Sequence, residues 1–174
     1  MTWTQFHQRQ EAIRAVLDHA RANPAAEIDL AAVPAAAEVF TSRDELLRAL
    51  HYKWMRSLVG RVDVGVEDAD ADPRGDRVEA VTKAWRRTAA DNPVLRQVLD
   101  AHADDPALAE GALREQRMLA LSAGLSEADE PLEEINRVGK AFMGLVRSST
   151  PSRSDRRTRR RRPLAQLRRL IPSR

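Results

Sequence analysis

Apolar residues recur at intervals of three and four along most of this chain, which is the spacing that places them on one face of an α-helix. The clearest stripe follows Ser42 and consists of these residues: Leu46, Leu47, Leu50, Trp54, Leu58 and Val62. Ser42 and Glu45 also have the spacing of a capping box, in which the hydroxyl accepts from the Glu45 amide and the carboxylate reaches back to the Ser42 amide. We therefore predict a helix that starts at Ser42 and runs to Val62.

The same spacing predicts the elements on either side of this helix. A first helix should cover about residues 4–22 and end at Asn23-Pro24, because the residue before a proline disfavours helical backbone. Two very short helical pieces, separated at Pro34, are expected between residues 28 and 39. Residues 63–75 are rich in Asp and contain Pro73 and Gly75, so we expect a solvated loop there.

Further helices are expected beyond that loop. Apolar stripes predict helices over about residues 76–90, 106–123 and 131–147, with a short helix after Asn92-Pro93. An Asp or Asn followed by Pro favours a helix start, because the first residue caps the helix and proline fits its first turn. Apolar residues make up 43% of the chain, glycine is rare and β-branched runs are absent, so the fold class predicted is all-α.

Charge is divided unevenly along the chain. Residues 151–174 hold ten arginines and one aspartate, a net charge of +9, so residues 1–150 carry −6 of the chain's total of +3. We expect three regions: an N-terminal helical domain over residues 1–62, a helical bundle over 63–148, and a disordered Arg-rich tail over 149–174. The end of the tail, with Leu164, Leu167 and Leu170, has the pattern of a short amphipathic helix.

The strongest helix start also resembles a known family, the TetR/AcrR-type transcriptional regulators. The resemblance rests on Phe40, Ser42, Arg43, Asp44, Glu45, Leu46 and Leu47, which are similar to the entry into that family's fourth helix, and on Leu30 and Ala31, which resemble a pair in its second helix. It implies a small N-terminal helix-turn-helix bundle followed by a C-terminal bundle for effector binding and dimerisation. A DNA-binding homodimer that regulates transcription would be the corresponding function.

This chain departs from the family pattern in the segment that would read DNA. Residues 32–39 are about four residues shorter than that pattern, and no Lys or Arg lies between Ala22 and Ser42. Base reading needs polar or basic side chains on the recognition element, and phosphate contacts need cations. The leading hypothesis is therefore a TetR-like regulator with a reduced DNA-reading motif. The alternative is a non-enzymatic helical interaction protein that has lost base readout and docks on nucleic acid or anionic membrane through its basic tail.

Candidate binding residues follow from these hypotheses. Phosphate contacts are assigned to these arginines: Arg43, Arg156, Arg157, Arg159, Arg160, Arg161 and Arg162. Four large apolar residues on different predicted helices either form the small apolar effector pocket that the resemblance implies or belong to the core: Trp54, Trp85, Met118 and Phe142. Leu119 and Leu145 are assigned to the dimer interface implied by the resemblance.

Metal, cofactor and catalytic chemistry are not predicted. The four histidines form no i, i+4 pair on a helix and the chain has no cysteine, so we expect no metal site and no cofactor. Most carboxylates lie at helix starts and in loops, where capping explains them, and we expect no enzyme activity. No apolar run approaches the roughly 20 residues of a membrane span, and the N-terminus lacks the apolar core of a signal peptide. We therefore expect a cytoplasmic protein.

Overall fold

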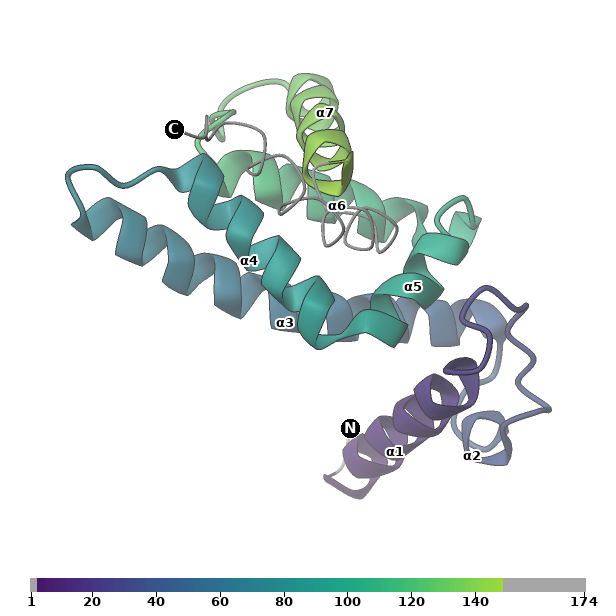
Figure 1. Cartoon of the computed structure of the whole chain (residues 1–174). Coiled ribbons are helices and arrows are strands. Elements are labelled where there is room, and N and C mark those ends of the chain that lie inside the picture. Colours follow the sequence, from purple (N-terminus) through teal and green to yellow (C-terminus); the bar gives the residue numbers. More distant parts are fainter. Residues whose placement is uncertain (1–2, 149–174) are drawn as a thin grey trace, which may run out of the picture.

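The computed structural model describes residues 3–148 and confirms the all-α prediction for them, with no strand in that range. Its helices, in chain order, are α1 (Trp3–Ala20), α2 (Pro34–Ala37), α3 (Arg43–Ala71), α4 (Arg77–Asp91), α5 (Pro93–Ala101), α6 (Pro106–Ser122) and α7 (Leu132–Ser148). In Figure 1, α4 returns alongside the long α3, α6 packs across this pair, and α7 lies on α6. The helices α1 and α2 lie near the N-terminal end of α3.

The predicted stripe on α3 forms the centre of the core. All six of its members, Leu46, Leu47, Leu50, Trp54, Leu58 and Val62, are buried. The helix that carries them packs against α1, α4, α5 and α6. Burial of large side chains of this kind contributes about 1.5–3 kcal/mol each, so this one helix organises much of the fold's stability.

The predicted helix start at Ser42 is confirmed, with one change in its hydrogen bonds. The Ser42 hydroxyl accepts from the Glu45 amide at 3.2 Å. The Glu45 carboxylate, however, accepts from the amide of Thr41 at 3.0 Å rather than from that of Ser42. Thr41 offers the same oxygen a second donor, its hydroxyl at 2.9 Å, while Arg9 of α1 holds the other oxygen at 2.9 Å. The cap therefore also fastens α1 to α3.

This cap predicts an acid-sensitive contribution to stability. The Thr41 amide, and next to it the Arg9 side chain, lower the pKa of Glu45 from 4.5 to about 2. A lowered carboxylate pKa stabilises the fold above about pH 4.5 and loses that effect as the pH falls toward about 2. We expect Glu45→Gln to remove about 1 kcal/mol at pH 7, after allowance for solvent screening, and almost nothing near pH 2.

Urea unfolding at pH 7, 4 and 2 measures this difference. The exposed Glu133 of α7, which has no ion-pair partner among residues 3–148, provides the matched control as Glu133→Gln. That control should leave the unfolding free energy almost unchanged at each pH. A constant difference between wild type and Glu45→Gln from pH 7 to pH 2 would contradict the assigned electrostatic role.

The prediction that residues 63–75 form a loop was wrong for most of that stretch. Helix α3 continues to Ala71, and only residues 72–76 connect it to α4. The extra turns are stabilised by α4, whose Arg77 binds Asp70 through its Nε at 2.5 Å, and by Val66, which packs against the core. Tertiary contacts thus override the polar local sequence. The predicted domain boundary after Val62 consequently falls inside a continuous helix.

The connection between α1 and α3 contains less helix than predicted. Only the second of the two expected pieces forms, as the single turn α2. Ahead of it, Asp29 accepts from the Ala31 amide at 2.9 Å and the Val33 amide donates to Leu30 at 3.1 Å, which are turn contacts. Pro34 restricts Val33 to a non-helical φ of −128°, so a helix cannot continue through it. Over residues 21–42, α2 is the only helix.

Two glycines shape the packing of α6 and α7. Gly124 adopts φ +67° after α6, where the Gly124 amide donates to Leu121 and the Leu125 amide to Ala120, both at 3.0 Å, as in a Schellman motif. Gly139 of α7 lies so close to α6 that a Cβ there would be 2.4 Å from the Gln116 carbonyl oxygen.

Within residues 3–148, no helix combines the length and apolar composition that crossing a membrane requires.

Candidate functional site

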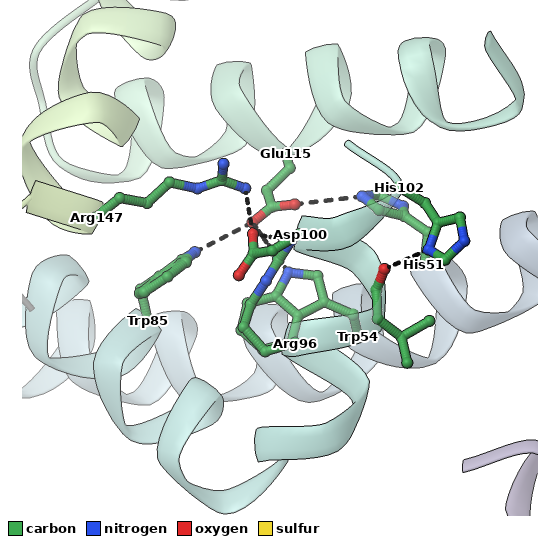
Figure 2. A network of polar contacts seen from close by, with 9 residues as sticks. His51, Trp54, Trp85, Arg96, Asp100, His102, Glu115 and Arg147 are labelled. Atoms are coloured by element: carbon green, nitrogen blue, oxygen red, sulfur yellow. Dashed lines mark hydrogen bonds and ion pairs between the residues drawn. The ribbon is translucent and has the colours of Figure 1, made fainter. Parts of the chain in front are cut away.

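The most distinctive polar feature of the described chain is a buried carboxylate, that of Glu115 on α6. Its side chain is 5% exposed, and its direct partners come from three other helices, α3, α4 and α5 (Figure 2). Glu115 occupies the core-facing stripe of α6 because it is spaced seven residues after Leu108 and four before Leu119, both of which are buried. A charge in such a position is costly unless it is paired and hydrogen-bonded.

Three ring N–H groups satisfy this carboxylate. Trp54 of α3 donates from Nε1 to Oε1 at 2.9 Å, and Trp85 of α4 donates from Nε1 to the same oxygen at 3.1 Å. The Nε2 atom of His51 on α3 lies 3.2 Å from Oε2. Because an ionised carboxylate only accepts, we place the proton of this contact on His51 Nε2. The two tryptophan rings also meet edge to face, with centroids 5.8 Å apart.

Arg96 of α5 supplies the opposite charge. Its Nη1 lies 3.8 Å from Glu115 Oε1, and its guanidinium stacks 4.7 Å from the centroid of the Trp54 ring. Arg96 Nη2 also forms an ion pair with Asp100 Oδ1 at 2.9 Å. Arg147 of α7 binds the same Asp100 oxygen at 3.0 Å. The result is a chain of alternating charges that connects α6 through α5 to α7, visible around Glu115 in Figure 2.

The balance of these contacts keeps Glu115 ionised. Burial acts to raise its pKa, but the His51 hydrogen bond, the Arg96 charge and the Trp54 N–H together lower the pKa below its ordinary value. The Arg96 side chain remains incompletely satisfied, because its Nε and Nη1 atoms have no hydrogen-bond partner within residues 3–148. Both oxygens of the Glu115 carboxylate are therefore hydrogen-bonded, whereas the Arg96 guanidinium is only partly so.

This arrangement joins helices through the contacts of one buried carboxylate. Both carboxylate oxygens accept hydrogen bonds from the protein itself, Oε1 from Trp54 and Trp85 and Oε2 from His51. These contacts fix the relative positions of α3, α4, α5 and α6, because displacing any one of these helices would leave a buried polar group without its partner. We call this set of residues, His51, Trp54, Trp85, Arg96 and Glu115, the buried carboxylate cluster.

The four residues considered for an effector pocket lie in the core. Trp54, Trp85 and Phe142 are buried, and Met118 of α6 is partly buried and packs against the hydrophobic core. The two tryptophans form part of the buried carboxylate cluster, and none of the four lines the hollow between α1 and α3, that between α3 and α4, or that between α3 and α6. Their burial fits the core interpretation, and the ligand-pocket interpretation stays a prediction.

The other predicted site residues have varied surroundings. Arg43 is half-buried and binds the α6 cap residue Asp105 at 2.5 Å, so its charge is already paired within the chain. Leu119 is fully buried inside the subunit, which corrects its assignment to a dimer interface, because it has no exposed surface left to cover. Leu145 is 65% exposed. Arg156, Arg157, Arg159, Arg160, Arg161 and Arg162 lie outside the described residues.

Sequence reasoning missed Glu115, Arg96 and His51. The available signal was that Glu115 continues the stripe through Leu108 and Leu119, so that a charge stands at a core position of α6. His51 carried a similar signal, because it lies four residues after Leu47 and three before Trp54 on the stripe of α3, whereas Arg96 stands beside Leu95 on the short α5. Over residues 3–148, no three His, Cys, Asp or Glu side chains are grouped as a metal ion would require. Comparisons with protein-family models, curated proteins and solved structures found no match to the chain.

Proposed function

We propose that this chain is a non-enzymatic, TetR-like helical regulator that binds nucleic acid mainly through its basic tail. The observation that carries the proposal is the charge distribution. Residues 151–174 carry +9, whereas the remaining residues carry −6. Cations that neutralise phosphates supply most of the sequence-independent affinity for nucleic acid. The tail is therefore the part of the chain best suited to that contact.

The segment before α3 offers little for base reading. It has a single helical turn and no Lys or Arg over residues 22–42, and the first basic residue of α3, Arg43, is bound to Asp105. Direct readout needs side chains that reach base edges from an element seated in a groove. These features support a regulator whose DNA-reading motif is reduced, and they favour binding with little sequence preference.

The resemblance also supports a homodimer formed by the closing pair of helices. Leu132 and Leu145 of α7 are 61% and 65% exposed, so they are the apolar side chains that such an interface would cover in place of Leu119. Two-fold pairing is the commonest form of oligomer. We include the homodimer in the proposal on these grounds, together with a cytoplasmic location.

An anionic membrane surface is the second candidate partner. The sequence after the Arg run contains Leu164, Leu167, Leu170 and Ile171, which alternate with Arg168 and Arg169 in an amphipathic pattern. Basic segments with such leucines are suited to the charged headgroup region of a bilayer. The same charge thus supports two docking partners, and the leucines distinguish them.

The full chain tests this proposal in a mobility-shift experiment. We expect binding to a duplex from the region upstream of its own coding sequence and to an unrelated duplex with affinities within about tenfold of each other. Both should weaken steeply as salt rises from about 50 to 200 mM. Vesicles of anionic or neutral lipid form a parallel series. Tight binding to anionic vesicles without binding to either duplex would favour the membrane candidate and contradict the nucleic-acid proposal.

A further inference from the structure

A groove of about 670 Å³ lies between α1 and α3, outside the buried carboxylate cluster. Its two walls are the facing sides of these helices. Residues between Phe6 and Ile13 line it from α1, and residues between Glu45 and Ser57 line it from α3. In Figure 1, α1 lies at an oblique angle to the N-terminal part of α3, and its N-terminal end points away from the rest of the helices. The volume falls within the range of about 300–1,000 Å³ that is typical of small-molecule sites.

The inner surface of this groove is apolar. Ile13 of α1 and Ala49 of α3 are 3% and 6% exposed and form its floor. Phe6 and Tyr52 face the groove from the two helices and are 40% and 65% exposed, which is unusual for aromatic side chains. Exposed apolar surface that is concave and bordered by polar groups is typical of a binding site.

The rim of the groove carries uncompensated positive charge. Arg48, Lys53 and Arg56 line it from α3, and within residues 3–148 none of the three forms an ion pair. The one acidic residue that lines the groove, Glu45, is already bound to Arg9 at 2.9 Å and to the Thr41 amide at 3.0 Å. Arg9 is thereby neutralised, whereas the other three cations remain available to an anion from solution.

We propose that this groove binds a small amphipathic carboxylate that is free in solution. The apolar part would lie between Phe6 and Tyr52 over Ile13 and Ala49, and the carboxylate would meet the cations of α3. Charge complementarity carries this choice, because the three unpaired cations call for an anion and the aromatic walls call for an apolar body. The lining stretch of α3 spans about 18 Å at 1.5 Å per residue, which suits an extended chain rather than a compact ion.

A ligand in this position would bridge α1 and α3. These two helices flank the connection over residues 21–42, and the Arg9–Glu45 pair links them directly. The groove therefore lies where occupancy can fix the angle of α1 and the path of the segment that follows it. This inference does not rest on the proposed nucleic-acid function, because none of the tail arginines contributes to the groove.

Laurate, used below its micelle-forming concentration, is a suitable probe for isothermal titration with the full chain. We expect saturable binding that is at least about tenfold weaker for dodecanol, which has the same apolar chain without the charge. The triple variant Arg48→Gln, Lys53→Gln, Arg56→Gln should lose at least about tenfold in laurate affinity. Because these side chains are not ion-paired within residues 3–148, the variant should keep its circular dichroism spectrum and melting temperature.

The matched control removes three cations from elsewhere on the surface, as Lys83→Gln, Arg87→Gln, Lys140→Gln, and should bind laurate as the wild type does. Tyr52→Ala should weaken laurate binding with no change in net charge. Equal laurate affinity in the wild type and the Arg48/Lys53/Arg56 variant would overturn the proposal. The proposal would also be overturned if the wild type bound anionic vesicles or duplex DNA through these three cations but did not bind free laurate. The groove would then bind a membrane surface or a polyanion.

Discussion

Replacing Glu115 with alanine is expected to lower the free energy of unfolding by about 3–5 kcal/mol. The change removes the acceptor of the Trp54 and Trp85 N–H groups and the partner of His51. It also leaves Arg96, which is 9% exposed, as a buried charge with only Asp100 beside it. Each orphaned buried group adds its own desolvation cost, so the effect should exceed that of deleting one ordinary hydrogen bond.

Urea unfolding followed by circular dichroism measures this loss. Glu110→Ala is the matched control, because Glu110 lies on the same helix, is exposed and pairs only with the exposed Arg114. Its effect should stay within about 0.5 kcal/mol, as expected for a surface pair. A Glu115→Ala loss below about 1 kcal/mol would show that the cluster is not a linking element of the core.

Two further variants separate charge from hydrogen bonding at this position. Glu115→Gln keeps an oxygen that can accept from Trp54 or Trp85 but removes the charge facing Arg96, so we expect an intermediate loss. The double variant Glu115→Leu with Arg96→Met removes both charges together. The double variant should be more stable than Glu115→Leu alone, because the single variant leaves the buried Arg96 charge without the carboxylate that compensates it.

Local signals explain how well the helices could be predicted. The starts at Ser42, Asp76, Asn92 and Asp105 follow from short-range chemistry, namely a side chain that caps the helix or a proline in its first turn. The core stripe of α3 follows from spacing alone. These features depend on residues within one or two helical turns of each other, and the sequence displays such relations directly.

The errors arise where distant contacts decide the outcome. The polar stretch after Val62 reads as a loop, yet α4 packs along it and Arg77 binds Asp70, which keeps the chain helical to Ala71. The Glu45 carboxylate reaches Thr41 because Arg9, 36 residues away in sequence, fixes its other oxygen. Neither partner is visible in the local pattern of the element it stabilises.

The candidate sites follow the same rule. Glu115 was detectable as a charge on an apolar stripe, but its partners come from α3, α4 and α5, and only the folded chain brings them together. The groove between α1 and α3 depends on the angle between two helices, which periodicity does not specify. By contrast, the division of charge between body and tail needs no fold, and it is the basis of the strongest functional expectation.

Truncation after Thr150 is expected to remove most binding to nucleic acid. The deleted residues carry +9, and the remaining chain carries −6, so the body should be repelled by a polyanion. Each neutralised phosphate contributes about one unit to the slope of log affinity against log salt, and a loss of six or more contacts corresponds to at least about 10³-fold in affinity at low salt. Helicity should change little, because the buried core lies between Ala12 and Val146.

Three variants make this result specific to the tail. Replacing Arg156, Arg157, Arg159, Arg160, Arg161 and Arg162 with glutamine in the full chain should reproduce most of the loss. The Arg48, Lys53 and Arg56 variant of α3 should retain nearly full binding and the wild-type salt slope. Replacing Leu164, Leu167 and Leu170 with serine should leave duplex binding unchanged, since only docking on a membrane needs those side chains.

Sequence-specific binding to the upstream duplex that survives truncation at full strength would refute the tail hypothesis. It would establish that the short segment around α2 reads DNA despite its lack of cations.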